Sequence, residues 1–212
     1  MDWVGRRGLT VAALLLGVSV LSSGCGLVSG PAPLSKDAPL SMEVSSPAVT
    51  RSVLPAEFTC YAKGKPKTPP VFWQGAPSPR TKSFALVFDD SGAPISPWVY
   101  WLVFDIGRET TDIGTNMLPP SANQARNSTG ATGYEPPCPV GSPHKYRIAV
   151  YALDTASLGG SVTDGAQLLT TWTTIAPHVL ARGTMTVTVC PPGAASQASR
   201  ICRAAAKSGS AG

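Results

Sequence analysis

Four short apolar runs, separated by residues typical of turns, constrain the fold of this chain more than any other feature. They are rich in valine, threonine and aromatic residues, which favour the pleated, half-buried surface of a β-strand. Glycine and proline, at 21 residues each, disfavour long helices and favour turns between the runs. We therefore expect an all-β fold, mainly strand with a few short helices, with strands at residues 83–88, 98–106, 146–153 and 184–189.

The run at residues 98–106 is apolar throughout, which predicts a strand covered on both faces, whereas the run at 184–189 alternates and predicts one wetter face. Two helices are expected outside the strands. Thr163 can cap a helix at residues 164–175, and a second helix at 177–183 is expected to end at Gly183.

The N-terminus has the pattern of an export signal. Arg6 and Arg7 precede an uncharged apolar stretch at residues 9–21. That stretch is shorter than the roughly 20 residues that span a bilayer core, so a permanent transmembrane helix is disfavoured. Residues 22–24 lead into Cys25 in a pattern that resembles a bacterial lipobox, although serine stands where the lipobox usually has leucine.

This pattern predicts a lipoprotein signal peptide at residues 1–24 and an acylated, palmitate-bearing Cys25. The lipid would hold the protein at the bacterial cell membrane, facing the extracytoplasmic side. An ordinary cleaved signal with an incidental cysteine remains the alternative, and the export route, general or twin-arginine, stays open.

The rest of the chain divides by composition into three parts. Residues 25–40 are small and proline-rich, as expected of a tether. Residues 41–193 contain all the expected strands and predict one domain, and residues 194–212 predict a flexible basic tail. No internal repeat is present, which disfavours solenoids and propellers.

Four cysteines remain when Cys25 is assigned to lipid, an even number in an oxidising compartment. Disulfides are the expected outcome, and of the three possible connectivities we favour Cys60 with Cys138 and Cys190 with Cys202. A zinc site is disfavoured because no close cysteine pair has ligand spacing. We expect no metal and no cofactor.

The charge balance argues against a nucleic-acid partner. The formal net charge is +5, and the predicted signal peptide contributes only Arg6, Arg7 and Asp2 to it. No dense run of lysine and arginine with interleaved aromatic residues is present, and export makes such a partner less favourable still.

Three segments carry a resemblance to a known family: LPAEFTC with the following PKTPPVFWQGAPSPRTKSFALVFDD, then SGAPISPWVYWLVFDI, then YEPPCPVGSPHKYRIAVYALD. With PHVLA near the end, their order and spacing resemble the phosphatidylethanolamine-binding protein family, in its bacterial Raf-kinase-inhibitor-like branch, over residues 41–193. The resemblance implies two antiparallel sheets, the larger one central, with a small anion-accepting pocket at one end. It also implies a binding or inhibitory module, not an enzyme.

The family pocket is built from a loop of the form Asp-Pro-Asp-Ala-Pro, a strand of the form Trp-x-His-Trp, and a Gly-Pro-x-Pro segment ending in His-Arg-Tyr. This chain matches much of that pattern and departs from it at Ser91, Gly92, Tyr100, Pro136 and Lys145. The resemblance implies a ligand-binding site formed by Asp90, Ala93, Tyr100, Pro137, His144 and Tyr146.

Tyr100 stands where the family has its pocket histidine. A histidine beside an aspartate can become charged and donate a strong hydrogen bond to an anion, whereas a phenol donates without charge. We therefore expect weaker binding of phosphate than is usual in the family, or a shift toward a neutral polar or partly aromatic ligand. The expected function is capture of a small anionic or polar group, such as a lipid headgroup or another polar metabolite.

Several other residues are expected to have structural roles instead of catalytic or binding ones. A catalytic pair of Asp89 and Asp90 is disfavoured, because neighbouring strand residues point to opposite faces. Asp89 is expected instead to serve the turn after its strand. His178 and the tryptophans Trp73, Trp98 and Trp101 are expected to pack. A serine hydrolase is disfavoured because no G-x-S-x-G turn is present.

A protein-interaction or inhibitor module is the alternative function. The segment at residues 107–132 is long, polar and rich in turn formers, as recognition loops often are. Together with the pocket rim, it could meet a kinase, a protease or another protein partner.

Overall fold

The structure is a computed structural model that describes residues 1, 39, 41–90, 92–93, 97–160, 162–193, 200 and 202–203. The predicted signal peptide, the predicted lipidation site Cys25 and most of the tether and tail lie outside these residues. Within the described part of the chain, no helix is both long enough and apolar enough to span a membrane.

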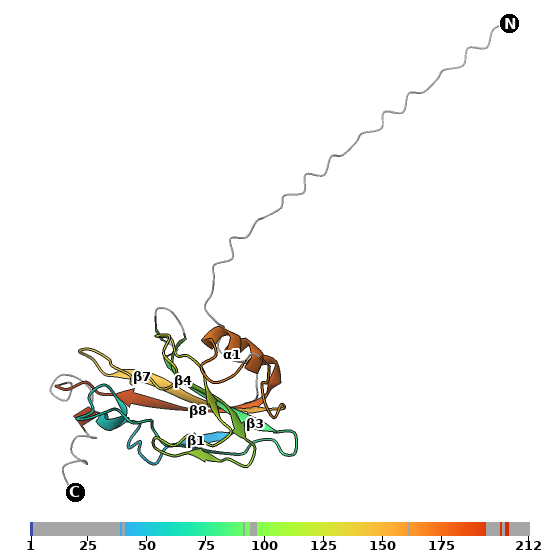
Figure 1. The fold of residues 1–212 in the computed structure, drawn as a ribbon. Helices are drawn as coiled ribbons and strands as arrows, with labels where there is room; N and C mark the ends of the chain where they lie inside the picture. The colour runs from blue at the N-terminus through green and yellow to red at the C-terminus, as the bar shows by residue number, and fades with distance from the viewer. Residues whose placement is uncertain are drawn as a thin grey trace.

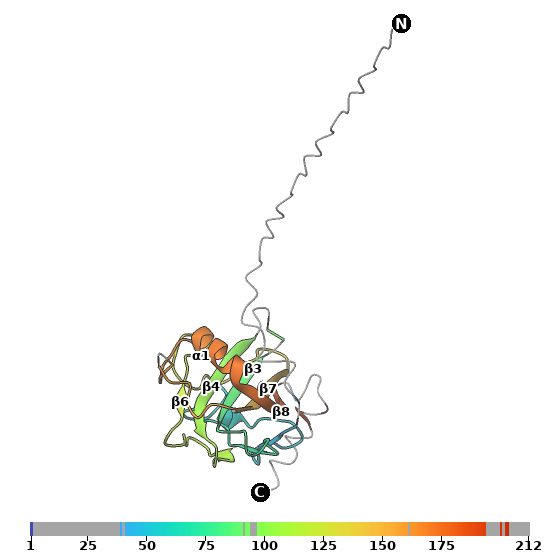
Figure 2. The same cartoon turned by 90° about the vertical axis from the view of Figure 1, so that its right-hand side faces the viewer.

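Two antiparallel sheets form the domain (Figure 1). The larger sheet has the order β6-β4-β3-β7-β8, which Figure 2 shows from β6 on one side to β8 on the other. The smaller sheet has the order β1-β2-β5. The strands are β1 (Glu43–Ser45), β2 (Val71–Gln74), β3 (Ser83–Asp90), β4 (Trp98–Gly107), β5 (Asp112–Ile113), β6 (Asn123–Gln124), β7 (His144–Leu153) and β8 (Val179–Val189).

The large sheet is the middle layer. In Figure 1 the helix α1 (Leu168–Ile175) lies on one side of it and β1 on the other. In β3, Leu86 and Phe88 belong to the core shared with the small sheet, whereas Val87 belongs to the core shared with Trp172 of α1. Every residue of β3 is therefore buried. The all-β prediction is confirmed.

A bulge in β4 changes which face its side chains occupy. Phe88 pairs with Trp101 and Asp89 pairs with Val99, so Tyr100 is an extra residue on β4. Such a bulge re-aims the neighbouring side chains. Trp101 is buried in the core shared with the small sheet and Tyr100 packs against that same core, which puts two consecutive residues on one side of the sheet.

The helix expected at residues 164–175 is shorter than predicted. It begins only at Leu168, after Gln167, and Thr163 does not cap it. Gly165 has a φ of 76°, a left-handed conformation that the body of a right-handed helix does not contain. The residues before α1 therefore form a turn, closed by the bond from the Ala166 amide to the Thr163 carbonyl.

The second predicted helix, at residues 177–183, is wrong. Only a short 3-10 turn, η2 (Ala176–His178), is present, and β8 begins at Val179 and pairs with β7. Gly183 lies inside β8 instead of ending a helix. A Cβ there would come within 2.5 Å of the Met42 carbonyl oxygen, so the glycine permits a close approach of the chain just before β1.

The tryptophan and histidine predictions hold in part. Trp73 and Trp101 are buried, and Trp98 is half-buried. His178 is partly exposed, and its Nδ1 lies 2.8 Å from the Asp154 carboxylate, so it forms a surface ion pair instead of packing.

Both favoured cysteine pairs are bonded. Cys60 joins Cys138 across a sequence separation of 78 residues, and Cys190 joins Cys202 across 12. Among the described residues, no three His, Cys, Asp or Glu side chains are grouped as a metal ion would require.

Candidate functional site

The ends of three neighbouring strands bring together side chains that lie far apart in the sequence. Asp90 is the last residue of β3, Tyr100 is the bulged residue of β4, and His144 and Tyr146 are the first and third residues of β7. Because β3 lies between β4 and β7, its end is flanked by both partners. We call these four residues the strand-end cluster.

Asp90 and His144 are directly bonded. The Nε2 atom of His144 lies 2.7 Å from the Oδ2 atom of Asp90, whose other oxygen accepts a bond from the Gly92 amide at 2.8 Å. The Asp90 side chain is 9% exposed, whereas that of His144 is 43% exposed. The carboxylate is therefore held from two sides, and the imidazole is the part that meets solvent.

The two phenols lie beside this pair. The rings of Tyr100 and Tyr146 meet edge to face with centroids 5.4 Å apart, and the His144 ring lies 5.0 Å from Tyr146. Phe88 lies behind both phenols, at 5.9 and 6.0 Å. The aromatic rings thus form an apolar wall next to the polar Asp90–His144 pair.

Burial keeps both phenols protonated. It raises the pKa of Tyr100, and the nearby Asp90 carboxylate raises it further, although a hydrogen bond with Tyr146 opposes the shift. Burial also raises the pKa of Tyr146, and the effect of Tyr100 adds to it. Both residues therefore remain neutral hydroxyl groups near neutral pH, as expected from the sequence for Tyr100.

Ala93 and Pro137, the other two expected site residues, are less closely joined to the cluster. Ala93 is half-buried in the loop after β3, and Pro137 is buried with its carbonyl bonded to the Cys60 amide at 3.3 Å. No hydrogen bond or ring contact in the described part of the chain links either residue to the cluster. The segment that contains Pro137 is nevertheless fixed beside β4, because the Glu135 amide donates to the Tyr100 carbonyl at 2.8 Å.

Residues outside the expected site help to hold the segment that contains Pro137. The Cys60–Cys138 disulfide attaches it to residues 56–61, and the Tyr61 hydroxyl donates to the Pro139 carbonyl. The Tyr134 hydroxyl donates to the Phe58 carbonyl at 2.5 Å. Cys60 and Cys138 were recognisable from the even cysteine count, but nothing in the sequence indicated the tyrosine contacts.

Asp89 does not serve the turn, contrary to the expectation. It is fully buried in β3 and receives two bonds from Arg147 of β7, at 3.0 Å from Nε and 2.5 Å from Nη2. Burial raises the pKa of the Asp89 carboxyl, and Arg147 partly offsets that rise. Asp89 therefore anchors β3 to β7, whereas Asp90 belongs to the strand-end cluster.

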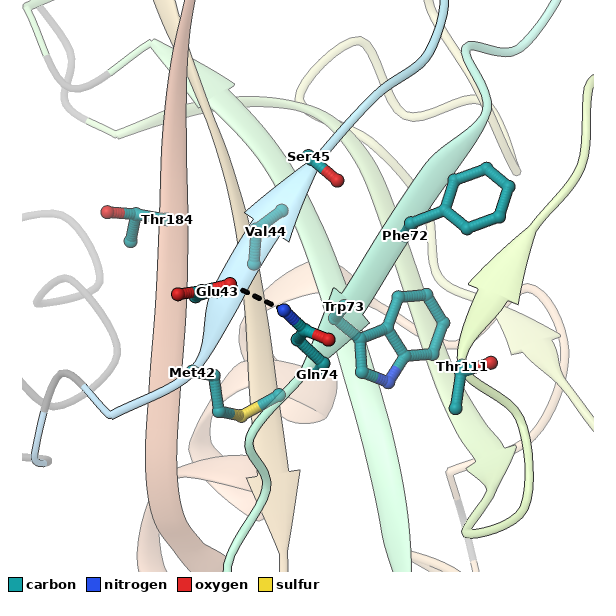
Figure 3. Close-up of a pocket in the computed structure, with 9 residues that line it drawn as sticks. All are labelled: Met42, Glu43, Val44, Ser45, Phe72, Trp73, Gln74, Thr111 and Thr184. Carbon is teal, nitrogen blue, oxygen red and sulfur yellow. Dashed lines mark hydrogen bonds between the residues drawn. The ribbon is translucent and has the colours of Figure 1, made fainter.

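Two hollows stand out in the described part of the chain, and none of the six expected site residues lines either one. The first has a volume of about 750 Å³ and lies over β1 and β2 (Figure 3). Its polar side chains Glu43 and Gln74 already bond each other, with the Gln74 Nε2 donating to the Glu43 Oε2 at 2.5 Å. The second has a volume of about 480 Å³ and lies between residues 65–68 and 116–118.

Comparison with known proteins places the chain in a family. The family model described as phosphatidylethanolamine-binding protein matches residues 44–190, and the chain belongs to this family. The predicted family and fold class are thus confirmed.

Individual relatives agree with this assignment. A UPF0098 protein of Methanothermobacter thermautotrophicus is 37% identical over 110 residues, covering 50% of this chain and 71% of the relative. A UPF0098 protein of Mycobacterium tuberculosis is 34% identical over 115 residues, covering 53% of this chain and 54% of the relative. The matching regions thus include about half of this chain.

Solved structures show the same fold. The Escherichia coli protein YbcL, described as a member of the mammalian family, is 27% identical with a TM-score of 0.61, covering 70% of this chain and 98% of its own. A homologue of phosphatidylethanolamine-binding protein from Chlamydia trachomatis is 25% identical with a TM-score of 0.62, covering 72% and 99%.

Proposed function

We propose that this protein is a membrane-anchored, non-enzymatic lipoprotein of the bacterial cell envelope that binds a small anionic or polar group at the strand-end cluster. The group would resemble part of a lipid headgroup, in keeping with the family description. The lipid on Cys25 would attach the protein to the extracytoplasmic side of the membrane.

The direct bond between His144 and Asp90 carries the binding proposal. An imidazole N–H can donate a hydrogen bond to an anion. The half-exposed ring of His144 is accessible to such a group, and the neutral hydroxyls of Tyr100 and Tyr146 supply donors without charge. The Asp90 carboxylate opposes the approach of an anion, so binding is expected to be weak.

Nuclear magnetic resonance titration tests this proposal on the full chain in detergent. Phosphate, phosphoethanolamine and acetate at millimolar concentration should shift signals of His144 and of both cluster tyrosines. His144→Gln should abolish the response, and Tyr100→His should tighten phosphate binding by about tenfold because it adds a second group that can be charged. Lys82→Gln, on the exposed surface before β3, is the matched control.

The absence of local shifts with all three ligands would contradict binding of a small anion. Shifts that persist in His144→Gln would place the ligand elsewhere.

Lipid attachment needs a separate test. We expect the wild-type chain to fractionate with membranes and to have a mass increased by acyl chains, whereas Cys25→Ala should lose both properties. A wild-type chain without added acyl mass would contradict this part of the proposal alone, because the strand-end cluster does not depend on it.

The second candidate function is capture of a protein partner through the segment at residues 107–132. Exposure of Met117 and Leu118, at 68% and 38%, favours it because such apolar side chains are enriched at interfaces. If this candidate is correct, Met117→Ser should abolish capture of a partner from envelope extracts, while His144→Gln should leave capture intact.

A further inference from the structure

The second hollow has walls that two loops hold in place. It lies between residues 65–68 and 116–118, which are distant in sequence. The Thr68 amide donates to the Asn116 Oδ1 at 2.9 Å, and the Asn116 amide donates to the Thr68 Oγ1 at 2.7 Å. These reciprocal bonds join the loops, so the hollow is part of the folded structure instead of a gap between independent segments.

Two aromatic side chains contribute to the lining of the hollow. Trp101 and Tyr134 line it, but their polar atoms already have partners. The Trp101 Nε1 donates to the Gln124 Oε1 at 2.7 Å, and the Tyr134 hydroxyl donates to the Phe58 carbonyl at 2.5 Å. A ligand therefore gains little by offering hydrogen-bonding groups to these two side chains. Because Trp101 is only 1% exposed, the aromatic contact comes from the half-buried Tyr134.

Apolar side chains also lie at the rim. Met117 and Leu118 line the hollow and are 68% and 38% exposed. Methionine adapts to ligands of irregular shape because its side chain is unbranched and flexible. Covering these two side chains would remove apolar surface from water, which favours a ligand with a hydrocarbon portion.

The charged residues that line the hollow are both lysines. Lys65 and Lys67 line the hollow, and no carboxylate is among its lining residues. The Lys67 ammonium is bonded to Glu57 at 2.7 Å, whereas Lys65 has no ion pair within the part of the chain that the structure describes. The exposed Lys63 adds a further positive charge to the same loop. An anionic end group on the ligand would complement Lys65.

We infer that this hollow is a binding site for a small anionic amphiphile, such as a medium-chain carboxylate. The hydrocarbon chain would cover Met117, Leu118 and Tyr134, and the carboxylate would lie against Lys65. Its volume of about 480 Å³ is within the range of ligand-binding pockets. The site shares no residue with the strand-end cluster, so this inference does not depend on the proposed function.

Isothermal titration of the full chain with decanoate, below its micelle concentration, tests the inference. Decanol and acetate each retain one half of the required chemistry. Decanoate should bind about fivefold more tightly than decanol, because an exposed ion pair contributes at most about 1 kcal/mol, and acetate should not bind measurably at this site. Lys65→Gln should reduce decanoate binding to the level of decanol, and Met117→Ser should weaken both.

Lys82→Gln is the charge-matched control, since this lysine is exposed and outside the hollow. Equal affinity for decanoate and decanol, or decanoate binding that Lys65→Gln leaves unchanged, would overturn the inference. So would decanoate binding that is lost in His144→Gln and retained in Met117→Ser, because the ligand would then occupy the strand-end cluster.

Discussion

Arg147 on β7 binds both carboxylate oxygens of Asp89 on β3, and the Asp89 side chain is fully excluded from solvent while that of Arg147 is 20% exposed. Removal of one partner of such a pair is strongly destabilising, because the other charge is left buried and unpaired. Its net contribution to stability is nevertheless small, because burial of both charges opposes their attraction.

We predict that Asp89→Leu and Arg147→Met each lower the free energy of unfolding by about 3 kcal/mol, whereas the double variant stays within about 1 kcal/mol of the wild type. Urea unfolding at pH 7 measures all four corners of this cycle. Additive losses in the double variant would show that the two residues act separately.

The same pair predicts a pH dependence. Burial raises the folded-state pKa of Asp89 above its unfolded value, and Arg147 only partly offsets this. The native state therefore favours the protonated carboxyl more than the unfolded state does. Its contribution to stability is fully present below about pH 3.9 and is lost as pH rises through the folded pKa. The double variant should lack this acid-range slope when unfolding is measured between pH 3 and 6.

Gly183→Ala should weaken the attachment of β1. Its Cβ would lie 2.5 Å from the Met42 carbonyl oxygen and 2.7 Å from a Val44 methyl group, so the backbone must shift. We expect a loss of about 1–3 kcal/mol in urea unfolding, typical of overpacking. Gly64→Ala is the control, because nothing lies within 4 Å of its added Cβ. Equal effects of the two substitutions would contradict the close approach.

Tyr151→Phe should leave stability at pH 7 unchanged or raise it by up to about 1 kcal/mol. The Tyr151 hydroxyl is buried and has no hydrogen-bond partner among the residues that the structure describes, so its removal relieves a desolvation cost. Tyr134→Phe is the contrast, because it removes the bond to the Phe58 carbonyl and should cost about 1 kcal/mol. A clear loss of stability in Tyr151→Phe would show that its hydroxyl has a stabilising partner.

Alkaline unfolding gives a second readout of Tyr151. Burial raises the pKa of Tyr151 to about 12, while an unfolded tyrosine ionises near pH 10. The stability contribution is thus present below pH 10 and is lost as pH rises from 10 to 12, because the unfolded chain releases its proton first. Tyr151→Phe should therefore unfold with a shallower dependence on pH than the wild type over this range.

The two disulfides should differ in their contributions. Chain-entropy arguments give about 4.5 kcal/mol for the pair separated by 78 residues and about 3 kcal/mol for the pair separated by 12. Urea unfolding of the Cys60→Ser/Cys138→Ser and Cys190→Ser/Cys202→Ser double variants compares them. A larger loss in the second variant would contradict the entropic expectation.

The sequence was sufficient for four of the eight described strands, β3, β4, β7 and part of β8, and for much of the strand-end cluster. Apolar runs identified β3, β4 and β7, and the family resemblance indicated Asp90, Tyr100 and His144 before any geometry was known. The pairing of Asp89 with Arg147 was not accessible in this way, because it depends on the register between strands that lie 58 residues apart in the chain.

Local sequence signals gave wrong predictions where tertiary contacts determine the secondary structure. Gly183 suggested the end of a helix, since glycine is common there. In the fold, its missing Cβ allows the Met42 carbonyl, just before β1, to approach β8 closely. Thr163 suggested a helix cap, but Gly165 places a turn between it and α1. The bulge at Tyr100 likewise has no clear signal in an apolar run, because it appears only when β3 and β4 are aligned.

The bond between Cys60 and Cys138 encloses β2, β3, β4 and the exposed Met117. A protease that cuts the backbone near Met117 would produce two fragments that remain covalently joined. The nicked protein would then migrate as one species without reductant and as two with it. Cleavage at this surface would therefore release neither half.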